Sequence, residues 1–218
     1  MKQTTVNANG LGRVVEGTMN YLGPMDETPY VDVLNRGRDR LNAETHTIRF
    51  TDARPAAGEL SLDREGFRLV HHRTALAPSD FRAQQRVEQV YAREIESIVK
   101  AVTGADRVVA APGAVLRFNG ERDKTVKPAA IAHSDYTEYT LRAELGFHVN
   151  LRSAEFTGFS RIVAYQTWRA LSPPPQDNTL ALCDSRTVSV KNRVVSKFDA
   201  GGDVPLEFYM YRDNPAHR

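Results

Sequence analysis

The sequence predicts an α+β protein built on an antiparallel barrel or jelly roll. Two observations lead to this fold class: one long helical pattern lies within residues 79–104, and six or more short β-branched or aromatic runs follow it. With 218 residues the chain has the length of one large domain, and we expect residues 1–218 to fold as a single domain.

The first 60 residues are rich in Gly, Pro, Asn and Asp and contain short β-like pieces such as Thr47–Thr51. This composition favours a meandering N-terminal arm, residues 1–60, that wraps on the body of the protein rather than a separate domain. The next segment, "LSLDREGFRLVHH", predicts a short hairpin that turns at Arg64–Gly66.

Residues 80–103 form the one long helix that the sequence predicts. Ser79 and Asp80 are N-cap residue types, and Gly104 stands where a helix commonly ends in glycine. Between them, apolar residues recur at helical spacing: Val87, Val90, Tyr91, Ile95, Ile98, Val99 and Val102. We expect this helix to pack outside the β core.

The β core is expected over residues 105–218. Its strand-like runs are "DRVVAAPGAVLRF", "LGFHVNLR", "RIVAYQTWRAL", "LALCDSRTVSV", "VVSKF" and "PLEFYMY". Short runs of this kind, separated by turn residues, are typical of barrels and jelly rolls.

Composition argues against several classes of partner. The 29 basic and 27 acidic residues are scattered without a basic block, which disfavours nucleic acid and anionic membrane surfaces. No apolar run reaches the ~20 residues of a membrane helix, and the N-terminus lacks the order of a signal peptide. Cys183 is the only cysteine, so an internal disulfide and a cysteine-based zinc site are excluded. We therefore expect a cytoplasmic protein.

The stretch "AIAHSDYTEYT" places His133 and Asp135 two residues apart, straight after a small apolar run. Alternate residues of a strand face the same side, so this imidazole and carboxylate could bind one ion together. Two histidines and one carboxylate, with coordination positions left open, are the ligand set of non-haem Fe(II) oxygenases. The alternative is an ordinary hydrogen-bonded strand end, and the pair by itself does not separate the two.

A third ligand would be a downstream histidine, and the sequence offers His148 and His217. His148 follows His133 by 15 residues and would reach back from an adjacent strand. His217 follows by 84 residues, with several expected strands between, which is the separation that a facial triad on a double-stranded β-helix needs. We favour His217, and His148 stays open.

Several short segments also resemble one protein family, in the same order along nearly the whole chain. They are "YLGPM", "FTDARP", "LDREGFRLVHHRT", "YAREIESIVKAVTGADRV", "HSDYTEYTLRAEL", "YQTWRAL", "DNTLALCDSRTVSV" and "RDNPAHR". The family is the CmcJ/NvfI-type (asaB-like hydroxylase/desaturase) group of non-haem Fe(II)/2-oxoglutarate-dependent oxygenases. The resemblance implies a double-stranded β-helix (jelly-roll or cupin-like) core. It also implies hydroxylation, desaturation or a related C–H oxidation of a small-molecule secondary metabolite.

The resemblance further implies the site. His133, Asp135 and His217 would be catalytic as the metal ligands of Fe(II), with 2-oxoglutarate and dioxygen as co-substrates. The distal carboxylate of 2-oxoglutarate needs a cation, ideally the planar fork of arginine. Arg169 is the visible candidate, with Gln166 on the same expected strand. Arg169 could instead cap a strand or pair with an acid.

Two departures from the family pattern matter. Gln166 stands where members usually have Asn, and Ala170 stands where Pro follows the Trp–Arg pair, so the pocket shape is expected to differ. The sequence also stops at Arg218, one residue past His217, whereas the family continues. We therefore expect the C-terminal end to be truncated.

Two rival functions remain open. One is a metal-dependent, cupin-like hydrolase or isomerase that uses the same three ligands around zinc or manganese. The lack of a clear Glu or Lys base nearby counts against it. The other is a catalytically inactive accessory binding protein, which the early C-terminus supports. The expected partner is a small-molecule substrate, and a homodimer is left open.

Overall fold

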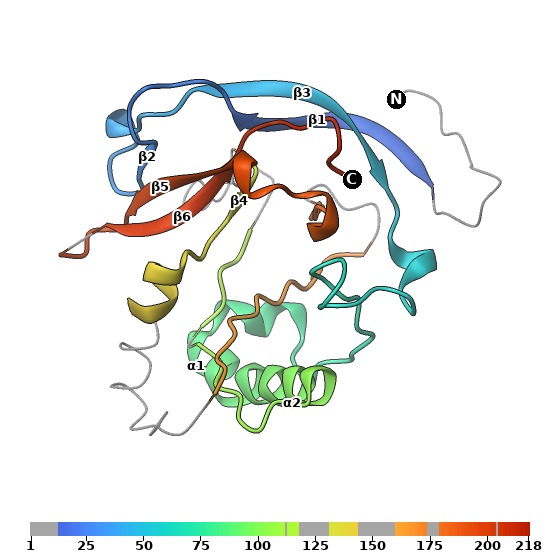
Figure 1. The fold of residues 1–218 in the computed structure, drawn as a ribbon. Helices are drawn as coiled ribbons and strands as arrows, with labels where there is room; N and C mark the ends of the chain where they lie inside the picture. The colour runs from blue at the N-terminus through green and yellow to red at the C-terminus, as the bar shows by residue number, and fades with distance from the viewer. Residues whose placement is uncertain (1–12, 112, 118–130, 144–159, 174–178, 204) are drawn as a thin grey trace. The chain divides into compact units, whose positions relative to one another are not determined.

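The computed structural model describes residues 13–111, 113–117, 131–143, 160–173, 179–203 and 205–218 (Figure 1). The chain divides into two compact units. The first, which we call the β unit, comprises Met1–Val70, Ala129–Phe147 and Ala181–Arg218. The second, the helical unit, comprises His71–Pro128 and His148–Leu180. Each unit is described by itself, and the expected single domain over residues 1–218 stays a prediction.

The β unit begins with a two-stranded antiparallel sheet of β1 (Val14–Leu22) and β3 (Ala43–Thr51) (Figure 1). The ladder is nine residues long. At Gly17 a Cβ atom would stand 2.9 Å from the Phe50 ring, so the ring in this position packs directly over the glycine. The expected strand at Thr47–Thr51 is confirmed. The N-terminal arm over residues 1–60 stays a prediction, but its β pieces are longer than expected, because cross-strand pairing orders nine residues in each of β1 and β3.

The second sheet has four strands in the order β2-β5-β6-β4. Their bounds are Tyr30–Asp32 for β2, Arg193–Asp199 for β5, Leu206–Tyr211 for β6 and His133–Ser134 for β4. Strand β2 runs parallel to β5, and the other two pairings are antiparallel. Strands β5 and β6 confirm the last two β runs predicted from the sequence.

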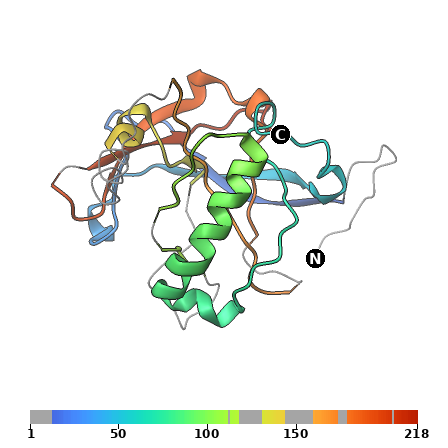
Figure 2. The ribbon, with the colours of Figure 1, turned by 90° about the horizontal axis from the view of Figure 1, so that it is seen from below.

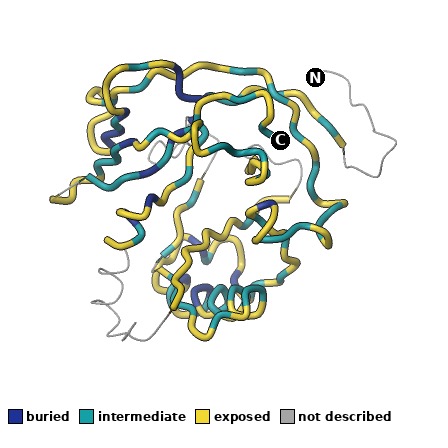
Figure 3. The backbone as a smooth tube through the Cα atoms, viewed as in Figure 1, coloured by how far each residue is buried: buried dark blue, intermediate teal, exposed yellow. Residues whose placement is uncertain are grey.

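The apolar core of the β unit includes the partner of the candidate ligand His133. The residue paired with His133 across β4 and β6 is Met210, which is 3% exposed. Met210 clusters with other buried residues of the β unit: Leu22, Val31, Ile131 and Phe208. Buried positions along the backbone are dark blue in Figure 3. Removal of this apolar surface from water stabilises the strand that carries His133.

The helical unit is built around a continuous helical run of α1 (Gln84–Arg86), a π-helical turn (Val87–Tyr91) and α2 (Ala92–Thr103) (Figure 2). Gly104 ends it in the left-handed conformation, with φ of 69°, and donates to the Lys100 carbonyl at 2.9 Å. The predicted end at residue 103 is confirmed.

The predicted start of this helix at residue 80 is displaced. Asp80 lies in a separate 3-10 turn, Pro78–Arg82, where its carboxylate accepts from the Ala77 N–H at 3.0 Å. Ala83 is extended and interrupts the run, so α1 begins at Gln84. The apolar face then packs as the sequence spacing predicts, and its buried cluster is Leu76, Phe81, Val87 and Tyr91.

Several strands expected from the sequence are not formed. Described residues 106–111, 113–117 and 161–171 contain no strand, and residues 180–190 contain only short 3-10 turns. The chain does turn at Arg64–Gly66, where Gly66 has φ of 84°, but no strands flank that turn. The run "LGFHVNLR", residues 145–152, lies outside the described residues. The double-stranded β-helix over residues 105–218 stays a prediction.

Candidate functional site

The His133–Asp135 pair lies at the end of β4, and its two side chains point at each other. The distance from His133 Nε2 to Asp135 Oδ1 is 3.1 Å. The side chains are 30% and 45% exposed, so the pair is open to solvent. Asp135 stands in the bend directly after β4, so the bend, rather than alternation along the strand, brings its carboxylate to His133.

The backbone decides which nitrogen of His133 is available. His133 Nδ1 lies 2.8 Å from the Ile131 carbonyl oxygen, which can only accept, so Nδ1 carries the hydrogen. In the neutral ring the lone pair is then on Nε2, the atom that faces Asp135. Metal-binding histidines are oriented in this way, with the second ring N–H given to a backbone carbonyl. A bound cation would stabilise the two adjacent donor atoms, and protonation of the ring would make them an ion pair.

The turn that follows Asp135 is anchored to strand β6 by a buried threonine. Residues 138–143 form a helical turn, and Thr140 is 3% exposed. Its Oγ1 accepts from the Glu207 N–H at 2.8 Å and donates to the carbonyl of the same residue. Thr137 Oγ1 in turn accepts from the Thr140 N–H at 3.2 Å. Sequence reasoning missed this anchor, because an alternation pattern does not show which strand a threonine will reach.

His217 lies in the segment after β6, against Tyr21. The two rings stack with centroids 5.8 Å apart. Both ring nitrogens of His217 are buried and have no hydrogen-bond partner among the described residues. Burial lowers the pKa of His217, and the charge of Asp213 partly opposes this, so the neutral form is favoured. A neutral imidazole with unused nitrogens has the donor chemistry of a metal ligand.

His217 is not brought together with the His133–Asp135 pair. Within the part of the chain that the structure describes, no group of three or more His, Cys, Asp or Glu side chains could hold a metal ion. His148, the alternative third ligand, lies outside that part. The donor set thus fits iron in its chemistry, and two donors converge. The assignment of His217 as the third ligand stays a prediction.

Arg169 and Gln166 belong to the helical unit, in the described stretch 160–173. Arg169 Nη2 lies 2.7 Å from His72 Nδ1, and Nη1 donates to the His72 carbonyl at 3.2 Å. Its Nε donates to Tyr91 Oη at 3.2 Å, with the guanidinium over the ring. Gln166 is exposed.

Residues 19–218 match the protein family described as "Oxidoreductase/YMDC permease-like domain". The chain belongs to this family. Among its relatives, the "Fe(II)/2-oxoglutarate-dependent dioxygenase nvfI" of Aspergillus novofumigatus is 33% identical over 154 residues, which are 68% of this chain and 54% of the relative. The "Hydroxylase/desaturase efuI" of Hormonema carpetanum is 28% identical over 194 residues, 80% of this chain and 63% of the relative. The resemblance to NvfI-type oxygenases is therefore confirmed.

Solved structures of an "iron and alpha-ketoglutarate-dependent endoperoxidase NvfI" show the fold. One covers 98% of this chain and 79% of its own, with a TM-score of 0.71 and 22% identity. Another covers 94% and 77%, with a TM-score of 0.70 and 24% identity. Together with the one long helix, this confirms a mixed α and β fold like that of NvfI. The chain spans about half the length of the first curated relatives that it matches. None of the helices in the described ranges has the length and apolar character to cross a membrane.

Proposed function

We propose that this chain is a non-haem Fe(II)- and 2-oxoglutarate-dependent dioxygenase that oxidises a C–H bond of a small-molecule secondary metabolite. The observation that carries the proposal is the His133–Asp135 pair, with Nε2 and Oδ1 3.1 Å apart and Nδ1 directed at the Ile131 carbonyl. The dioxygenase and hydroxylase/desaturase names of the relatives support the same reaction class. The outcome for the substrate is hydroxylation, desaturation or a related oxidation.

His133, Asp135 and His217 would hold the iron in this proposal. Bound iron would supply the redox chemistry by which dioxygen oxidises 2-oxoglutarate and hydrogen is then removed from the substrate. The contribution of the chain is to direct the His133 ring through the Ile131 carbonyl, and to hold the Asp135 carboxylate beside it. The same residues leave coordination positions free for the co-substrates.

Arg169 would bind the distal carboxylate of 2-oxoglutarate, with Gln166 as a second polar contact. The guanidinium is half-buried and fixed by His72 and Tyr91, which limits the entropy lost when it binds a carboxylate. It offers further N–H groups beyond those used, because a guanidinium carries five. The planar fork is also what a carboxylate binds best.

This role for Arg169 predicts a specific loss. Arg169→Ala removes a charge-assisted contact worth roughly 1.5–3 kcal/mol, so we expect 2-oxoglutarate to bind about 10- to 100-fold more weakly with iron content unchanged. Arg169→Lys should recover only part of the lost affinity for 2-oxoglutarate. Tyr91→Phe, which removes one acceptor of Arg169 but keeps the ring, is the matched control and should bind normally. Titration of 2-oxoglutarate without oxygen, followed by the Fe(II) charge-transfer absorbance, measures this affinity. An unchanged 2-oxoglutarate binding curve for Arg169→Ala would mean that another residue binds the distal carboxylate.

The reaction class is tested with added Fe(II), 2-oxoglutarate and ascorbate. A dioxygenase releases succinate from 2-oxoglutarate, slowly even without its own substrate, and the Asp135→Ala variant serves as the blank. A metal-dependent hydrolase or isomerase binds metal but forms no succinate. An inactive binding protein does neither. Succinate release equal to that of the blank would reject the proposal.

A further inference from the structure

A histidine ring is one of the groups that hold Arg169 in the helical unit, so this contact depends on which ring nitrogen carries a hydrogen. Arg169 Nη2 lies 2.7 Å from His72 Nδ1. A guanidinium offers only N–H donors and keeps its charge in a folded protein. Nδ1 of His72 must therefore accept, and the ring is neutral with its one hydrogen on Nε2.

The guanidinium makes two further contacts that do not involve the ring nitrogens of His72. Nη1 donates to the His72 carbonyl at 3.2 Å, and Nε donates to Tyr91 Oη at 3.2 Å. Both acceptors are present whether or not the His72 ring is protonated. Of these three contacts, only the one between Nη2 and Nδ1 is lost when a proton occupies Nδ1.

Glu94 in α2 offers a protonated His72 another partner. Glu94 Oε1 accepts from the Ala75 N–H at 2.8 Å, while Oε2 is buried and has no hydrogen-bond partner among the described residues. Burial raises the pKa of Glu94, but hydrogen bonding at Ala75 and Thr74 and attraction to His72 and Arg169 together lower it, so the carboxylate is charged near neutral pH. A buried acceptor without a donor is destabilising, and an N–H of a histidinium ring would remove that penalty.

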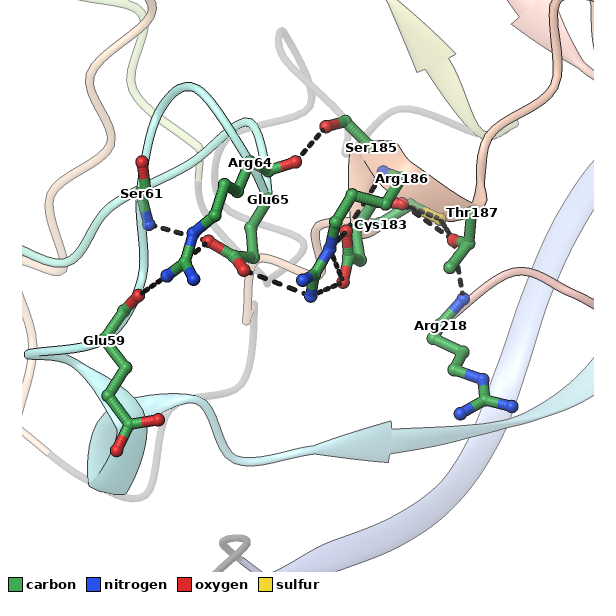
Figure 4. A network of polar contacts seen from close by, with 10 residues as sticks. Glu59, Ser61, Arg64, Glu65, Cys183, Ser185, Arg186, Thr187 and Arg218 are labelled. Atoms are coloured by element: carbon green, nitrogen blue, oxygen red, sulfur yellow. Dashed lines mark hydrogen bonds and ion pairs between the residues drawn. The ribbon is translucent and has the colours of Figure 1, made fainter.

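Arg186 in the β unit is held in a different way, by carboxylates (Figure 4). Asp184 Oδ1 accepts from Arg186 Nε at 3.0 Å, and Nη2 lies 2.6 Å from Asp184 Oδ2 and 3.1 Å from Glu65 Oε1. The same turn binds the Arg218 N–H through Thr187 Oγ1 at 3.2 Å. The hydrogen bonds from Arg186 lower the pKa of Asp184, so the contact between these two residues persists between about pH 5 and 8.

We propose that His72 is a proton-operated switch for Arg169. The neutral ring accepts from Nη2 and holds the guanidinium. The protonated ring lacks this acceptor, repels the guanidinium and pairs with the Glu94 carboxylate. Histidine is the side chain that ordinarily changes charge between about pH 5 and 8, and the switch acts in that range.

The charges that act on His72 set the direction in which variants shift its titration. The charge of Arg169 opposes protonation, because like charges repel, and the charge of Glu94 favours it. A tyrosine hydroxyl, as at Tyr91, carries no charge in this pH range, and Arg73, next to His72 in the sequence, is exposed to solvent. Loss of the Glu94 charge should therefore move the titration of His72 to lower pH.

NMR of the full chain, without metal or co-substrate, tests the switch. At about pH 8 we expect the ¹⁵N signals of His72 to show the hydrogen on Nε2. As the ring gains its second hydrogen, the Arg169 side-chain ¹⁵N signals should shift along the same curve. The protection of the Arg169 Nη hydrogens from exchange should fall about tenfold or more. Arg186 is the internal control, and its signals should stay constant.

His72→Gln keeps a neutral acceptor that does not titrate, so the Arg169 signals should no longer change with pH. His71→Gln, at the exposed neighbouring histidine, is the matched control and should keep the wild-type transition. An Arg169 transition that persists in His72→Gln would overturn the switch. So would a His72 ring with its hydrogen on Nδ1 at about pH 8 in the wild type, an observation that needs no variant.

Glu94→Gln tests the second partner. It should move the His72 titration to lower pH, whereas Glu88→Gln, which removes an earlier carboxylate of the same helical run, should leave it in place. An unchanged His72 titration in Glu94→Gln would overturn the pairing of the protonated ring with Glu94.

A consequence for the co-substrate rests on the proposed function, in which Arg169 binds 2-oxoglutarate. Release of Arg169 adds the cost of ordering one long side chain, so the iron-loaded wild type should lose about 2- to 10-fold more affinity for 2-oxoglutarate than His72→Gln as the pH falls. Both chains have the same proposed iron ligands, so their comparison cancels effects of pH on the metal. Equal losses together with a normal His72 transition would overturn the role of Arg169 in co-substrate binding and leave the switch supported.

Discussion

The surroundings of the His133–Asp135 pair differ from those of His217, although all three belong to the β unit. Strand pairing carries the pair: β4 binds β6, and Thr140 binds the same strand just beyond Asp135. His217 lies after the last strand, in a segment held by side-chain contacts to turns. The pair is partly exposed and its atoms contact each other, whereas the buried nitrogens of His217 have no partner among the described residues.

This difference shows two ways of holding a ligand. His133 is held by the backbone pairing of β4 with β6, and the turn after Asp135 is held to the same strand by Thr140. A turn such as 184–187 depends on a few individual side chains, and one substitution can release it. We therefore expect the two ligand regions to respond differently to mutation.

The largest effect is expected from the pair itself. His133→Ala and Asp135→Ala should each abolish iron binding and leave the fold intact, because both side chains are partly exposed and their loss opens no buried cavity. Elemental analysis after iron loading and thermal melting measure the two outcomes. His71→Ala and Asp63→Ala, at exposed positions, are the controls. Full iron occupancy in both pair variants would remove them as ligands.

A second prediction separates affinity from stability at His217. His217→Phe should lose most of the metal affinity, while the free energy of unfolding stays the same or rises by about 1–3 kcal/mol, because buried nitrogens without partners are replaced by carbon. His148→Ala should retain metal. Denaturant unfolding and metal titration are compared on the same samples. Normal metal binding by His217→Phe would favour His148 as the ligand.

An intermediate effect is expected at the anchor of the Asp135 turn. Thr140→Val removes the acceptor of the Glu207 N–H and should lower the free energy of unfolding by about 1–3 kcal/mol. Thr140→Ser keeps the hydroxyl, so its free energy of unfolding should fall much less. Urea unfolding measures both. Equal losses in the two variants would mean that packing of the methyl group, rather than the hydrogen bond, anchors the turn.

The smallest effect is a titration in the turn that holds Arg218. Hydrogen bonds from Arg186 lower the pKa of Asp184 below its ordinary 3.8. The contribution of this carboxylate to stability is therefore complete above pH 3.8 and is lost as the pH falls through its lower value in the folded protein. Arg186→Gln should raise that pKa toward the ordinary value. Carboxyl ¹³C NMR titration measures the shift, and an unchanged pKa would show that Arg186 is not its cause.

The elements that the sequence predicted well are those with a local signal. The helix ends at Gly104 as its glycine indicates, and strands β5 and β6 follow the apolar runs near the C-terminus. The long strand β1 was missed because its residues looked like those of an arm. The runs at 161–171 and 180–190 have β-forming residues but no strand, since a strand needs a backbone partner and its propensity depends on context.

The spacing of two residues by itself determined that His133 and Asp135 would lie close enough to contact, because they are near neighbours along the chain, with Asp135 in the bend after β4. The local backbone decided the tautomer of His133, through the Ile131 carbonyl two residues earlier. Only the tertiary structure decided the anchoring of the Asp135 turn to β6 by Thr140. It also decided that Arg169 would bind His72 and Tyr91, and that the Thr187 hydroxyl would hold the chain beside His217. The contacts of Thr140, Arg169 and Thr187 join residues from 31 to 97 positions apart, and local patterns carry no information about such pairings.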